Sequence, residues 1–235
     1  CSLDCKFCAT SKLKRIRNLN SDEIFDQAST INLQSKFYYN RPISNIVFMG
    51  MGEPLLNYIN LIEGINKITS KDGLGMSPKR ITVSTSGISK LIIKMADENV
   101  KFNLAVSLHS AVEKTRNKIM PFTIKFPLTD LKEAIKYWYN KTQKIVTYEY
   151  IVWKGINDDM NHINALVDFC KSSPSKVNII EYNKTSNDFF ISADDSIIKK
   201  YIEELESNRI PVTIRKSRGK DIDAACGQLA NKLKQ

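Results

Sequence analysis

Short apolar runs rich in β-branched residues alternate with amphipathic stretches along most of the chain, and this alternation restricts the fold more than any other feature. The runs are Ser44–Met49, Arg80–Ser84, Phe102–Leu108, Ile145–Val152, Val177–Glu181 and Pro211–Ile214. Strands that alternate with helices form βα units whose strands pair in parallel. The sequence therefore predicts an α/β fold built on a parallel sheet.

The stretches between the runs have helical periodicity. Their apolar side chains recur three or four residues apart, which predicts amphipathic helices. The stripes are Tyr58, Leu61, Ile62, Ile65 and Ile68; Ile88, Leu91, Ile92 and Met95; and Ile197, Ile198, Tyr201, Ile202 and Leu205. Another helix is predicted to start after a capping box, Asn20 with Glu23, and to run to about Phe37.

Length and composition favour one domain over residues 1–235, because 42% of the chain is apolar and no repeat or linker divides it. No apolar run approaches the roughly 20 residues that cross a bilayer, so we expect a cytoplasmic protein without a membrane partner. The net charge of +10 favours a polyanionic partner such as RNA, although nucleotide bias in a sequence rich in Lys, Asn and Ile is an equal alternative. The chain begins at Cys1, and we expect a segment upstream of it.

Three cysteines near the start have the spacing of metal ligands. In C-S-L-D-C-K-F-C, three residues separate Cys1 from Cys5 and two separate Cys5 from Cys8, so one loop can reach three corners of a metal cube. Three thiolates leave one iron open to hold the amino and carboxylate groups of a cofactor. Zinc is the alternative, but it needs a fourth ligand, and His109 and His162 lie far along the chain.

Polar residues follow the predicted strands, and parallel α/β folds gather functional groups at the carboxyl ends of strands. The run Ser44–Met49 leads into G-M-G-E-P-L-L-N, where glycines allow close approach of a ligand and Glu53 can accept from an ammonium group. A tight turn would explain the same glycines. A dinucleotide-binding oxidoreductase is disfavoured, because Pro54 and the lack of a third glycine break its fingerprint.

The cysteine spacing resembles that of the radical S-adenosylmethionine (SAM) superfamily, and F-M-G-M-G-E-P-L-L-N resembles the bacterial adenine-C2 RNA methyltransferases within it. S-T-S-G, S-L-H and Tyr182-Asn183 match that family in the same order. The resemblance implies a partial TIM-like (β/α)6 barrel that lacks the family's N-terminal accessory domain and first strand. It also implies a [4Fe–4S] cluster on Cys1, Cys5 and Cys8, and a SAM pocket lined by Gly52, Glu53, Ser84, Ser107, Leu108, His109 and Asn183.

D-I-D-A-A-C-G-Q-L, near the C-terminus, resembles the segment around the family's methyl-carrying cysteine, which corresponds to Cys226. C2 of adenine is electron-poor and cannot attack the methyl group of a sulfonium ion. The resemblance implies that Cys226 first takes a methyl group from one SAM as a nucleophile, and that a radical from a second SAM activates the S-methylcysteine. The family's resolving cysteine lies before the first cluster ligand, and so outside this chain.

The family's substrates are adenine 2503 of 23S rRNA and adenine 37 of tRNA, and flavodoxin or ferredoxin is the expected electron donor. Basic residues in 12–17 and 215–220 border the expected reaction centre. A methyltransferase of the antibiotic-resistance type that acts on C8 remains an alternative, although G-E-P-L-L-N favours C2. A non-catalytic metal-binding or RNA-binding module is the alternative outside the enzymes.

Overall fold

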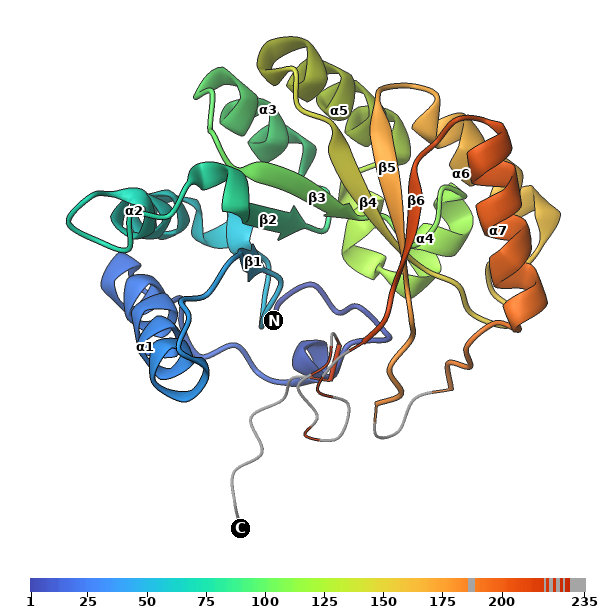
Figure 1. Cartoon of the computed structure of the whole chain (residues 1–235). Coiled ribbons are helices and arrows are strands. Elements are labelled where there is room, and N and C mark those ends of the chain that lie inside the picture. The colour runs from blue at the N-terminus through green and yellow to red at the C-terminus, as the bar shows by residue number, and fades with distance from the viewer. Residues whose placement is uncertain (186–188, 218, 220–221, 223–224, 226, 229–235) are drawn as a thin grey trace.

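The computed structural model describes residues 1–185, 189–217, 219, 222, 225, 227 and 228 (Figure 1). Within them, six parallel strands form one sheet whose spatial order is the order of the sequence. The strands are β1 Ile46–Phe48, β2 Ile81–Thr85, β3 Asn103–Ser107, β4 Val146–Ile151, β5 Ser175–Ile180 and β6 Val212–Arg215. All six predicted strands and the predicted α/β class are confirmed.

The sheet curves into a partial barrel with helices on its outer side (Figure 1). Among the described residues β1 and β6 are its two edges, because each pairs with one neighbour. The register is regular: Ile46 lies opposite Ile81, and Val177 lies opposite Val212. Because every strand runs in the same direction, all their carboxyl ends lie at one edge of the sheet.

The predicted helices are present. The α-helices are α1 Ser21–Tyr39, α2 Tyr58–Thr69, α3 Ser89–Asp97, α4 Glu113–Ile119, α5 Leu128–Thr142, α6 Met160–Cys170 and α7 Asp195–Ser207. Four short 3-10 helices are η1 Ala9–Lys12, η2 Pro54–Asn57, η3 Pro78–Arg80 and η4 Pro121–Lys125. No helix in the described part of the chain has both the length and the apolar composition needed to cross a membrane.

The main core lies between the sheet and the outer helices. Leu104 of β3, Tyr148 of β4 and Trp138 of α5 are fully buried there, and the Trp138 indole N–H donates to the Lys144 carbonyl oxygen at 3.0 Å. A second apolar cluster lies under residues 1–8, here called the cysteine loop. Its buried members are Leu3, Cys5, Phe7, Ile119, Met120, Ile151, Trp153 and Ile180. Apolar packing therefore fixes the cysteine loop to the barrel.

The predicted capping box starts α1 directly after the segment that leaves the cysteine loop. Asn20 Oδ1 accepts from the Glu23 backbone N–H at 2.9 Å, and Glu23 Oε2 accepts from the Asn20 backbone N–H at 2.9 Å. We expect Asn20→Ala to lower the free energy of unfolding by about 1 kcal/mol, because the helix loses a capping acceptor. Urea unfolding would measure the change. Asn20→Asp keeps an acceptor and should cost much less, and equal losses in the two variants would contradict this role of the cap.

Candidate active site

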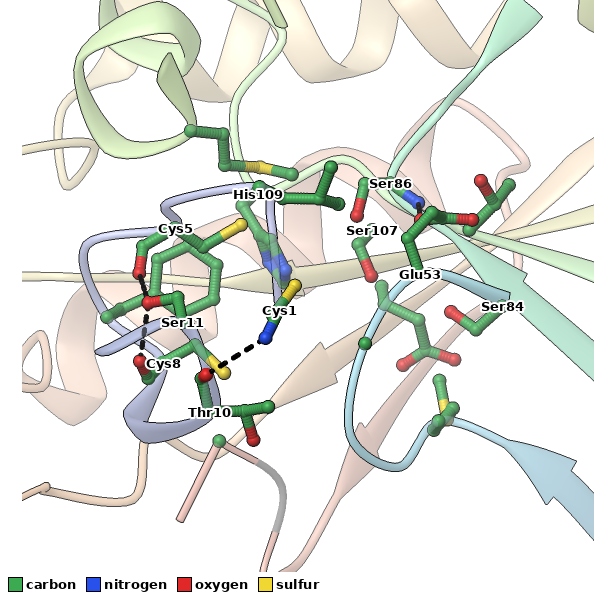
Figure 2. A pocket seen from close by; sticks show the side chains of 18 of the residues that line it. Cys1, Cys5, Cys8, Thr10, Ser11, Glu53, Ser84, Ser86, Ser107 and His109 are labelled. Carbon is green, nitrogen blue, oxygen red and sulfur yellow. Dashed lines mark hydrogen bonds between the residues drawn. The ribbon is translucent and has the colours of Figure 1, made fainter. Parts of the chain in front are cut away.

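A pocket opens at the carboxyl edge of the sheet, and residues from the cysteine loop and from five strand ends line it (Figure 2). The sequence-predicted residues among them are Cys1, Cys5, Cys8, Gly52, Glu53, Ser84, Ser107 and His109. Segments as far apart in the sequence as Cys1 and Tyr182 thus meet at one site, because parallel strands end at the same edge.

Backbone hydrogen bonds hold the second half of the cysteine loop and the residue that follows it in place. Lys6 N donates to the Ile119 carbonyl oxygen at 3.0 Å, and Ala9 N donates to that of Gly227 at 2.8 Å. The hydroxyl of Ser11 lies 2.5 Å from the Cys5 carbonyl oxygen and 2.7 Å from that of Cys8. Figure 2 shows the three cysteine sulfur atoms turned toward the same space.

The donor set fits an iron–sulfur cube better than a single metal ion. Burial, followed by the neighbouring Cys8 and Glu53, raises the pKa of the Cys5 thiol to about 12, so Cys5 becomes a thiolate only beside strong compensating positive charge such as bound iron. In the described part of the chain, no three His, Cys, Asp or Glu side chains converge on one point as a lone ion requires. A cube binds each thiolate at a different iron, so its ligands need not converge.

Glu53 occupies the N-cap of η2 and joins two loops of the pocket. Its Oε1 accepts from the Leu55 backbone N–H at 3.1 Å, and its Oε2 accepts from the Ser86 backbone N–H at 2.7 Å. Burial raises the pKa of the Glu53 carboxyl, and the Ser86 N–H opposes that rise. The carboxylate is thus fixed between the loop after β1 and the loop after β2.

The glycines before Glu53 leave room for a ligand. A Cβ built on Gly50 or Gly52 would meet no atom within 4 Å, although both residues line the pocket. Gly52 also has φ +113°, a conformation that side chains disfavour. The backbone of these glycines is therefore accessible from the pocket, and the contact of Gly52 with SAM stays a prediction.

His109 presents a neutral imidazole to the pocket. Burial, with a smaller effect of the nearby Arg116 charge, lowers the pKa of His109 to about 3. Its Nδ1 accepts from the Ile151 backbone N–H at 3.3 Å, which assigns the proton to Nε2. Phe7 of the cysteine loop packs edge-on against the ring, 4.9 Å between centroids. His109 can therefore donate one hydrogen bond to a ligand but carries no charge.

Two predicted residues that the structure describes are not among those that line the pocket. Leu108 is fully buried and contributes backbone hydrogen bonds under the loop after β3. Asn183 is buried beside pocket-lining Tyr182 and donates to the Ser217 hydroxyl at 2.8 Å. Cys226 lies outside the described residues. Gly227, which follows it in the sequence, lines the pocket.

The structure also brings three residues to the site that the sequence motifs did not indicate. Glu149 of β4 lines the pocket, and its Oε1 accepts from Asn178 Nδ2 at 2.9 Å. Asn157 is fully buried and donates to the carbonyl oxygens of His109 and Ile151 at 2.8 and 2.9 Å. Arg116 of α4 is fully buried behind the β2 and β3 loops. The sequence feature that could have indicated Glu149 is the presence of a charged residue within an otherwise apolar predicted strand.

Comparisons with known proteins agree with this architecture. The family model of the Radical SAM superfamily matches residues 1–167. A crystal structure of a radical SAM methyltransferase from Sphaerobacter thermophilus superposes with a TM-score of 0.93 at 34% identity, over 96% of this chain and 66% of that one. Streptococcus suis SuiB bound to S-adenosylmethionine shares the fold, with a TM-score of 0.63 at 15% identity over 92% of this chain and 44% of SuiB.

Sequence relatives identify the family within this superfamily. The probable dual-specificity RNA methyltransferase RlmN of Flavobacterium psychrophilum is 65% identical over 232 residues, which are 99% of this chain and 67% of that protein. The dual-specificity RNA methyltransferase RlmN of Nautilia profundicola is 40% identical over 99% of this chain and 65% of its own length. The chain belongs to the RlmN family of radical SAM RNA methyltransferases, and it spans about two thirds of the length of these relatives.

Membership of this family fixes the cofactors. Radical SAM proteins use a [4Fe–4S] cluster and SAM, and the cysteine loop and the glycine-lined cavity fit the two groups.

Proposed function

We propose that this chain is the catalytic domain of a cytoplasmic enzyme that methylates C2 of an adenine in 23S rRNA and in tRNA. The observation that carries the proposal is the pocket itself, in which Cys1, Cys5 and Cys8 lie beside Glu53 and His109. When bound there, the cluster and SAM supply a methyl group and, after one-electron reduction, a 5′-deoxyadenosyl radical. The electron donor would be a protein of the flavodoxin or ferredoxin class.

Different residues of the pocket are proposed to bind the cluster and SAM. Cys1, Cys5 and Cys8 are the proposed cluster ligands. Glu53 is the proposed partner of the SAM ammonium group, because its fixed carboxylate lies beside the accessible backbone of Gly52. Ser84, Ser107, the neutral His109 and Asn183 are proposed to orient SAM by hydrogen bonds, with Leu108 holding the loop after β3.

Cys226 is the proposed methyl carrier. A thiolate is nucleophilic enough to take a methyl group from a sulfonium ion, whereas C2 of adenine is not. In support of a position near the reaction centre, Gly227 lines the pocket and its carbonyl oxygen accepts from Ala9 N beside Cys8.

The segment that leaves the cysteine loop is a proposed RNA contact. Lys12, Lys14, Arg15 and Arg17 are all exposed there. Arg17 also binds both carboxylate oxygens of Glu23, at 2.6 and 2.7 Å, which fixes its guanidinium at the start of α1. Exposed cations attract the phosphate backbone, and the target adenine must leave its stack to enter the pocket.

The test uses the full-length protein, purified without oxygen, and supplies SAM, a reductant and transcribed 23S rRNA or tRNA. We expect 2-methyladenosine by mass spectrometry of the digested RNA. Cys226→Ala should reduce the product to background, because no thiolate remains to carry the methyl group.

Two outcomes would change the assignment. An 8-methyladenosine product would move the protein to the C8 methyltransferases, which G-E-P-L-L-N disfavours. Absence of SAM cleavage by a protein with a complete cluster would refute the catalytic proposal and leave a metal-binding or RNA-binding module.

A further inference from the structure

Arg116 is a fully buried cation that the proposed reaction does not use. It lies on α4, and its side chain extends beneath the loops that follow β2 and β3. Nε donates to the Leu108 carbonyl oxygen at 3.1 Å, and Nη2 donates to the Ser86 carbonyl oxygen at 2.8 Å. Burial lowers the pKa of Arg116 to about 10, so the guanidinium stays charged at neutral pH.

The charge of Arg116 is not neutralised by an ion pair within the described residues. The carboxylate of Glu113 attracts it, but Glu113 Oε2 accepts from the Leu128 backbone N–H instead. Arg116 Nη1 is buried and has no hydrogen-bond partner among the residues that the structure describes. Burying a cation without an ion-pair partner is strongly unfavourable, and Glu113 compensates it only at a distance, so a further negative charge is expected close by.

The cysteine loop is packed on the same helix. Ile119, at the end of α4, accepts a hydrogen bond from Lys6 N at 3.0 Å and shares an apolar cluster with Cys5. The guanidinium itself lies against the wall of the pocket: Arg116 Nη2 donates to the carbonyl oxygens of Ser86 at 2.8 Å and of Ser107 at 3.4 Å, and both residues line the pocket. The cation therefore lies directly behind the wall of the pocket that contains the proposed cluster ligands.

We infer that Arg116 is the buried counter-charge of the iron–sulfur cluster and raises the reduction potential of the cluster. The inference rests on the proposed ligation by Cys1, Cys5 and Cys8. A cube held by three thiolates is anionic, and it gains one further negative charge when it takes an electron from the external donor. A nearby fixed cation stabilises the reduced form more than the oxidised form, because the reduced form carries more negative charge.

The experiment compares Arg116→Met with Arg116→Lys in the cluster-loaded protein. The reduced cluster is followed by its electron paramagnetic resonance signal during a dithionite titration with redox mediators. We expect the midpoint potential of R116M to shift to more negative values, whereas R116K, which keeps the charge, stays close to the parent. An unchanged potential in R116M with the full iron content would overturn the inference.

Glu113→Gln gives an independent test of opposite sign. Removing this carboxylate leaves the Arg116 charge less compensated, so the potential should move to less negative values, and an unmoved or more negative value would count against the inference. If R116M fails to assemble a cluster, the potential of Glu113→Gln tests whether the Arg116 charge acts on the cluster. A parent protein that binds no iron and sulfide would refute the proposed cluster ligation, whereas a loaded parent whose variants keep its potential would refute only the role of Arg116.

Discussion

Replacing Cys5 by alanine is expected to remove the [4Fe–4S] cluster and to reduce SAM cleavage to background. The cysteine loop offers only three thiolates, so a cluster in the Cys5→Ala variant would keep two protein ligands. The cluster would also face the apolar side chains of Ile119 and Met120 at the position of the lost thiolate. Iron and sulfide content per chain, together with 5′-deoxyadenosine formed from SAM, would measure the loss.

The matched control is Cys170→Ala. Cys170 is also a buried cysteine, 4% exposed, but it lies in α6 within the main core and not at the pocket. It should keep the parent's iron content and SAM cleavage. Each variant loses one buried sulfur atom and should lose only about 1 kcal/mol of stability in the metal-free protein. Full cluster content in Cys5→Ala, or its loss in Cys170→Ala, would contradict the ligand assignment.

The strands and helices could be predicted because burial imposes their periodicity on the sequence. The stripe with Leu61, Ile65 and Ile68 is the buried face of α2, as periodicity requires. The boundaries were less accurate: the run Ser44–Met49 contains a strand of only three residues, Ile46–Phe48. Strand ends depend on which neighbour offers hydrogen bonds, and composition does not carry that information.

The site was predictable where a motif follows a strand. Glu53, Ser84, Ser107 and His109 lie in the pocket because parallel strands deliver the residues after them to one edge. The motifs do not distinguish side chains that line the pocket from those that support it, and Leu108 is of the second kind.

Arg116 could not be predicted from its local sequence. In E-K-T-R-N-K it resembles one more charge on a solvated helix face. It is buried where two strand-end loops, up to 30 residues earlier in the sequence, turn their carbonyl oxygens toward it. That environment is tertiary, and no short window of sequence contains it.

Glu53→Gln is expected to weaken SAM binding by roughly 10- to 100-fold, since a hydrogen bond to a charged group contributes about 1.5–3 kcal/mol. Each carboxylate oxygen now accepts one backbone N–H, from Leu55 and from Ser86. Glutamine offers one acceptor and one donor, so one of these N–H groups would face an NH2 group. The substitution therefore removes the charge proposed to bind the SAM ammonium and also separates the loops after β1 and β2.

Calorimetric titration of SAM into the cluster-loaded variant would measure the affinity, and Glu98→Gln is the control. Glu98 accepts from the Tyr58 hydroxyl at 2.6 Å on the outer surface, so the same change there should leave SAM binding unaltered. A parent-like affinity in Glu53→Gln would show that SAM does not use this carboxylate. If affinity falls while the iron content stays at the parent value, Glu53 acts on SAM and not on the cluster, because a general collapse of the pocket would also release the iron.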